Sequence, residues 1–214
     1  MFKKIVLGTV AALSLAIVPA HAATLNFVGT GQTHVVTGND IDPAFNTELQ
    51  IITGDQKTYG NGLFLDLDDS EAVVTYTYMG YEAGNRNFAA TVDGGLFINN
   101  GYGASDVGEQ VSSYQNSSGL LQFAFGTVAP FSAVGVFINN ALAYPASPDF
   151  AMGFSRIDAD SFYVLFDDIA TGDRDFDDLV MRIDVTAVPL PAGILLMLTA
   201  LLAMVALRRQ PKTA

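Results

Sequence analysis

Cysteine and tryptophan are both absent from this chain of 214 residues. The absence of cysteine excludes disulfide bonds, thiolate metal sites and cysteine nucleophiles. Because no disulfide can staple the fold, a folded domain here must be stabilised by a hydrophobic core, by bound metal ions or by both. The absence of tryptophan removes the largest aromatic side chain that could stack on a ligand.

Positive charge is scarce between residues 23 and 187. All 22 acidic residues of the chain lie in this span, which therefore carries a formal charge of about −17. Its five cationic residues are Lys57, Arg86, Arg156, Arg174 and Arg182. Such a charge disfavours nucleic acid and anionic lipid as ligands, and it favours solubility or cation binding.

Recognisable catalytic motifs are missing as well. The span contains one histidine, His34, with no partner pattern nearby. The sequence has no G-x-S-x-G elbow, no H-E-x-x-H motif and no phosphate-binding glycine loop. We therefore predict that the protein is not an enzyme. The paired carboxylates of a glycoside hydrolase remain an alternative, because their spacing is spatial rather than sequential.

The N-terminus has the pattern of a secretory signal peptide. Lys3 and Lys4 form a basic start, residues 5–18 are apolar, and Ala20-His21-Ala22 is an A-x-A cleavage site. The sequence therefore predicts a signal peptide over residues 1–22 and export of the segment that follows. We expect residues 23–187 to form one exported domain.

The last 27 residues have three parts. Val188-Pro189-Leu190-Pro191-Ala192 is followed by an uncharged apolar run to Leu207 and by the basic residues Arg208, Arg209 and Lys212. The run is about as long as a membrane-spanning helix, and the basic residues place its far end in the cytoplasm. A buried core helix is the alternative. We predict a transmembrane helix, with residues 188–214 acting as a C-terminal signal.

This tripartite tail resembles the PEP-CTERM sorting signal in its VPLPA variant. The resemblance implies a Gram-negative bacterium that makes exopolysaccharide, and an exosortase-like membrane protease that cuts near the proline motif. The tail would then hold the precursor in the inner membrane only transiently, before the mature protein reaches the cell surface or extracellular matrix. Residues 74–87 and 173–180 are also similar to segments of the ectodomains that commonly precede such tails.

Strand patterns dominate the central span. Leu179, Met181, Ile183 and Val185 alternate with Arg182, Asp184 and Thr186, as in a half-buried antiparallel strand. Further strands are predicted over residues 63–67, 72–79, 95–98, 120–125, 133–138 and 161–166, with glycine and asparagine between them. We predict an all-β fold, an antiparallel β-sandwich with a jelly-roll-like topology.

Six aspartates crowd the connection before the last predicted strand: Asp167, Asp168, Asp173, Asp175, Asp177 and Asp178. Carboxylates this close repel one another, and Ca²⁺ would relieve that repulsion through oxygen ligands. The loop is not an EF-hand, because Asp178 occupies the position where that loop needs glycine. We predict a Ca²⁺ site here; a solvated turn with aspartates capping backbone amides is the alternative. A second cluster, Asp66, Asp68, Asp69 and Glu71, more closely resembles a solvated turn.

Taken together, these patterns favour a structural or adhesive protein of the surface or matrix. The expected partners are an exosortase-like protease and exopolysaccharide, and no nucleic acid. A Ca²⁺-dependent carbohydrate-binding module is the second hypothesis. Stacking surfaces for that module would come from Tyr59, Tyr76, Tyr78, Tyr81 and Tyr102.

Overall fold

The predicted all-β class is confirmed: strands joined in antiparallel pairs make up most of the described chain. The computed structural model describes residues 23–29, 32–37, 46–53, 62–68, 71–129, 132–138, 150–168 and 175–188, together with 197, 200–202 and 204. The fold is therefore one of sheets, and within these ranges helix is found only at a few exposed residues near the C-terminus.

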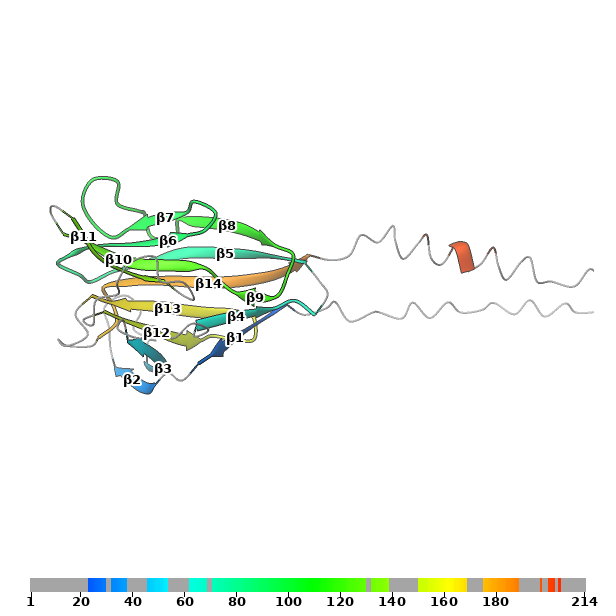
Figure 1. The fold of residues 1–214 in the computed structure, drawn as a ribbon, viewed down its shortest axis with the longest axis horizontal. Helices are drawn as coiled ribbons and strands as arrows, with labels where there is room; N and C mark the ends of the chain where they lie inside the picture. Colours follow the sequence, from blue (N-terminus) through cyan, green and yellow to red (C-terminus); the bar gives the residue numbers. More distant parts are fainter. Residues whose placement is uncertain are drawn as a thin grey trace, which may run out of the picture.

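The largest sheet has seven strands (Figure 1). In spatial order they are β2 (Gln32–Thr37), β3 (Asn46–Thr53), β12 (Ala151–Arg156), β13 (Ser161–Asp167), β14 (Leu179–Val188), β5 (Glu71–Gly80) and β8 (Gln110–Gln115). The strand β14 pairs with β13 on one side and with β5 on the other. A register shift between Val180 and Met181 marks a bulge near its start.

Two smaller sheets complete the body. A three-stranded sheet has the order β1 (Thr24–Val28), β4 (Gly62–Asp66) and β9 (Gly119–Leu120). A four-stranded sheet has the order β11 (Ser132–Ile138), β10 (Phe123–Ala129), β6 (Arg86–Thr91) and β7 (Leu96–Ile98). In both sheets every neighbouring pair is antiparallel.

One hydrophobic core joins all three sheets, because alternate side chains of their strands point into the same interior. The ring of Phe125 on β10 stacks on Phe166 of β13, with centroids 5.3 Å apart. On β12, Phe154 contacts both Phe27 of β1 and Phe123 of β10. The large sheet therefore packs face to face against the two smaller ones, through a core in which aromatic and aliphatic side chains are both buried.

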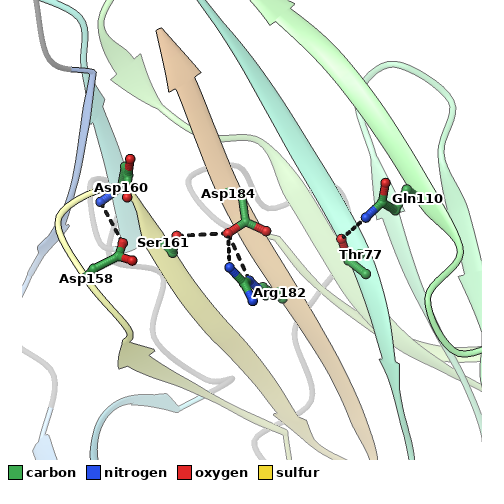
Figure 2. Close-up of polar contacts among 7 residues, drawn as sticks. All are labelled: Thr77, Gln110, Asp158, Asp160, Ser161, Arg182 and Asp184. Atoms are coloured by element: carbon green, nitrogen blue, oxygen red, sulfur yellow. Dashed lines mark hydrogen bonds and ion pairs between the residues drawn. The ribbon is translucent and has the colours of Figure 1, made fainter.

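The other face of the large sheet carries a band of polar contacts (Figure 2). Both Arg182 Nε and Nη2 donate to Asp184 Oδ1 on β14, at 2.9 and 2.6 Å, and Ser161 Oγ lies 2.8 Å from the same oxygen. Farther along the sheet, Gln110 Nε2 donates to Thr77 Oγ1 at 3.1 Å. The band is partly exposed, so its ion pair contributes little to stability.

The predicted facing of the last strand is confirmed. Leu179, Met181, Ile183 and Val185 are buried in the core, whereas Thr186 is exposed. The other predicted strands are found as well, although the one expected over residues 120–125 is divided between β9 and β10. The sequence patterns missed β1, β2, β3, β6, β8 and β12.

The start of β1 and the end of β14 lie at the same end of the body (Figure 1). Val188 is the last residue of β14. The predicted signal peptide, residues 189–192 of the motif, and Arg208, Arg209 and Lys212 lie outside the described residues. Among the residues that the structure does describe, no helix is both long and apolar enough to cross a bilayer.

Candidate functional site

Several loops meet at the end of the sheets opposite Val188, which we call the distal end (Figure 1). The pairing of Phe166 with Leu179 places the end of β13 beside the start of β14. Because β5 runs antiparallel to β14, Gly80 lies opposite Val180, and the connection from β5 to β6 begins there too. Glu82 N donates to the carbonyl of Asp177 at 2.8 Å, which ties this connection to the acidic loop.

One of the predicted aspartates, Asp168, is held by two amide side chains, that of Asn87, which is buried, and that of Asn85, which is exposed. Asp168 Oδ2 accepts a 2.7 Å hydrogen bond from Asn87 Nδ2, and its Oδ1 accepts one of 3.1 Å from Asn85 Nδ2. Thr127 on β10 donates its hydroxyl to Asn87 Oδ1 at 2.7 Å. Both carboxylate oxygens are therefore held by amides of the four-stranded sheet and its preceding turn.

Asn99 completes this arrangement from the end of β7. Its Oδ1 accepts from the Asn87 backbone at 2.7 Å, and its Nδ2 donates to the Asn85 carbonyl at 2.9 Å. We call Asn85, Asn87, Asn99, Thr127 and Asp168 the Asn–Asp network. Asn87 is fully buried and Asp168 nearly so, so unmade hydrogen bonds here would be costly. The network joins the four-stranded sheet to the end of β13.

Phe176 anchors the acidic loop on the outer face of the large sheet. Its side chain is fully buried in a second small core with Leu49, Leu165 and Val180. A Cβ atom added at Gly153 would come within 3.3 Å of the Phe176 ring, so the glycine makes room for it. Phe176 has a φ of 61°, a left-handed conformation that is strained for a bulky residue. Packing of this ring therefore helps to hold the loop in place, beside the hydrogen bond from Glu82 N to the Asp177 carbonyl.

The aspartates beside Phe176 have raised pKa values. Burial, together with the nearby carboxyls of Asp175 and Glu82, raises the pKa of the Asp177 carboxyl to about 8. Burial also raises the pKa of Asp178 to about 7 against the opposing effect of a 2.7 Å hydrogen bond from the Asp168 backbone. Carboxylates crowded in a desolvated site thus resist ionisation, which is the situation that a bound cation relieves.

The structure brings together five of the six predicted aspartates; Asp173 lies outside the described residues. Asp167, Asp168 and Asp177 are buried, whereas Asp175 and Asp178 are half-buried. Within the described ranges, no group of three or more acidic or histidine side chains is arranged to hold a metal ion. Sequence reasoning missed Glu82 and the partners of Asp168 in the Asn–Asp network, although Asn85 and Asn99 lie in glycine- and asparagine-containing gaps between predicted strands.

The tyrosines proposed as stacking surfaces divide into two groups. Tyr76 and Tyr78 lie in the hydrophobic core, so that part of the hypothesis is wrong: both belong to the inward-facing set of β5. Tyr102 is almost fully exposed and Tyr81 is partly exposed. Tyr59 lies outside the described residues. The ring of His34 contacts Phe176 at a centroid distance of 6.2 Å, so this histidine packs on the loop anchor.

Comparison with known proteins gave no match: no protein-family model, no curated protein and no solved structure is similar to this chain.

Proposed function

We propose that this chain is an exported, non-catalytic β-protein with a structural or adhesive role at the surface or in the extracellular matrix of a Gram-negative bacterium. An exosortase-like protease would receive it in the inner membrane through the tail at residues 188–214. Its matrix partner would be exopolysaccharide. The observation that carries this proposal is the match between the strand boundaries and the two sequence signals.

The match has two halves. The first strand, β1, begins at Thr24, two residues after the A-x-A site that ends at Ala22. The last strand, β14, ends at Val188, the first residue of the Val-Pro-Leu-Pro-Ala motif. Processing at both signals would leave the hydrogen-bonded sheets intact. This supports a division into a signal peptide (1–22), an exported domain (23–187) and a sorting tail (188–214).

The strand order supports a jelly-roll-like sandwich as the finer description of the fold. From β4 to β12 the chain passes repeatedly between the large sheet and the two smaller ones. Such crossing is typical of jelly rolls, whereas the consecutive neighbours β12, β13 and β14 form a meander at one side. We propose a jelly-roll-like core extended by this meander.

The Asn–Asp network supports a structural role. Asp168 is nearly fully buried, and its oxygens accept hydrogen bonds from the buried amide of Asn87 and from the amide of Asn85, so the carboxylate is poorly accessible to a substrate. Its position between β6 and β13 instead suits it to holding two sheets together. The charge of about −17 keeps such a domain soluble after release.

Intact mass measurement of the protein recovered from cells and from the medium tests the sorting proposal. We expect the surface or released form to begin near Ala23 and to end near Pro191, with any attached group adding to the mass. A variant with Pro189→Ala and Pro191→Ala should accumulate uncut in the membrane, whereas Pro211→Ala, beyond the apolar run, should be processed normally. A surface protein that still ends at Ala214 would make the anchor permanent and the exosortase proposal wrong.

A Ca²⁺-dependent carbohydrate-binding module is the second candidate, and the raised pKa values of Asp177 and Asp178 favour it. A cation at the distal end would favour the ionised carboxylates and thereby release protons. Calorimetric titration of the full chain with CaCl₂ should then show binding, and a chelator should lower the melting temperature. Asp177→Asn should weaken the binding, and Asp106→Asn, in an exposed turn, should not. An unchanged melting temperature with chelator and no heat of binding would exclude this candidate.

A further inference from the structure

A polar cavity of about 510 Å³ lies where the edge strand β8, the short strand β9 and the turn after β6 come together. Its lining residues come from three stretches of the chain: Leu65 of β4, Val92 and Asp93 of the turn, and eight residues between Tyr114 and Gln122. Cavities of this size are typical of sites for small molecules. The cavity is separate from the acidic loop and from the Asn–Asp network.

Two of the polar side chains of this cavity, Gln115 and Ser118, are held by hydrogen bonds. Gln115 Nε2 donates to Ser113 Oγ at 2.8 Å, and Ser118 Oγ accepts from the Leu67 backbone at 2.9 Å. Groups fixed in this way lose little conformational freedom when a ligand arrives.

The lining chemistry restricts the ligand class. The amides of Gln115 and Gln122 and the hydroxyls of Ser117 and Ser118 can each both donate and accept hydrogen bonds. Among the residues that the structure describes, no cationic side chain and one carboxylate, Asp93, line the cavity, so neither an anion nor a bare metal ion is matched. The buried side chains of Leu65 and Leu121 add a small apolar floor. A neutral ligand with several hydroxyl groups and an apolar ring face fits this combination.

We propose that this cavity binds a neutral saccharide unit of a polysaccharide chain, without Ca²⁺. The proposal deepens the adhesive role stated above, and it rests on that role only for the source of the saccharide. In the pairing of β5 with β8, Gln115 lies opposite Ala72. The residue before Ala72 is Glu71, which pairs with Val188 at the end of β14. The cavity is therefore at the end of the body from which the tail leaves, and the aspartates lie at the distal end.

Two glycines provide a matched pair of test variants. A Cβ atom added at Gly119, which lines the cavity, would meet no atom within 4 Å, and neither would one at Gly84, near the distal end. Neither glycine has the left-handed φ that would strain another residue. Gly119→Leu should therefore fold and occupy the cavity, whereas Gly84→Leu should fold and leave it open. Gln122→Ala removes one exposed amide without adding volume.

The full chain, purified in a detergent without a sugar headgroup, is applied to an array of neutral and acidic oligosaccharides. We expect binding to neutral members that persists in chelator. Titration of the best member should show affinity at least about tenfold weaker for Gly119→Leu and Gln122→Ala, and unchanged for Gly84→Leu. Equal melting temperatures of the three variants would verify that they fold.

Three results would overturn the proposal: no neutral oligosaccharide binds, binding is unaffected in Gly119→Leu, or binding disappears with chelator. The last result would assign saccharide recognition to the acidic loop. Because these outcomes leave the mass of the mature chain unaffected, failure of this site would not be confused with failure of the sorting proposal.

Discussion

The Asn–Asp network gives the sharpest test of how the sheets are joined, through the variant Asn87→Ala. The variant removes a 2.7 Å hydrogen bond to the Asp168 carboxylate and a 2.7 Å bond from the Thr127 hydroxyl. Hydrogen bonds to charged groups contribute about 1.5–3 kcal/mol and neutral ones about 0.5–1.5 kcal/mol. We therefore expect Asn87→Ala to lower the free energy of unfolding by about 2–4 kcal/mol.

Urea unfolding followed by circular dichroism or tyrosine fluorescence measures this loss, since the chain has no tryptophan. The control is Asn100→Ala, which removes only an exposed hydrogen bond to the Asn85 carbonyl and should cost less than about 1 kcal/mol. The double variant with Asp168→Ala should show a coupling energy of about 1–3 kcal/mol. Two results would refute the role given to the network. One is an equal loss of unfolding free energy for Asn87→Ala and Asn100→Ala, and the other is strict additivity of the free-energy changes of Asn87→Ala and Asp168→Ala.

Two further predictions concern the acidic loop. The pKa of Asp177 is raised to about 8 in the folded state, so the folded protein binds this proton more tightly than the unfolded chain does. The resulting contribution to the free energy of unfolding should be complete below about pH 4 and should be lost as the pH rises through about 8. Urea midpoints should therefore fall from pH 5 to pH 8, and Asp177→Asn should flatten that dependence and stabilise the protein at pH 8; midpoints that rise over this range would contradict the assignment. Phe176→Ala should lower the free energy of unfolding by about 3–5 kcal/mol, because it removes the largest side chain of the second core. Tyr102→Ala removes an almost fully exposed side chain and should leave the melting temperature unchanged. Equal melting temperatures for these two variants would show that Phe176 does not anchor the loop.

Strands with a clear alternation or a continuous apolar run could mostly be predicted from the sequence, whereas several strands with little apolar content were missed. β14 presents Met181 and Ile183 to the core and Arg182 to the outer face, so its period of two is plain. In contrast, the edge strand β8 reads Gln-Val-Ser-Ser-Tyr-Gln and has little apolar surface to bury. In β12, Gly153 sits where Phe176 needs space, and this requirement is visible only once the loop has been placed.

The candidate site was predictable in part for a related reason. The aspartates are close in sequence, so their clustering could be predicted from the chain alone. The partners of Asp168 could not be predicted, because Asn87 is 81 residues away from it and reaches it through the packing of two sheets. The acidic loop likewise gave no sign that Phe176 would turn inward, since one aromatic residue between charged neighbours has no periodic pattern.

The central position of β14 has a mechanical consequence for a protein held by its C-terminal end. Tension entering at Val188 would pull this strand along its own axis, between β13 and β5, which are both antiparallel to it. The hydrogen bonds of such pairs lie across the strand direction, so the force would load the whole ladder in shear rather than opening it bond by bond. This strand pairs with β5 as far as Val188 and with β13 from Leu179 to Asp184, and it is thus a force-bearing connection between the attachment point and the distal end.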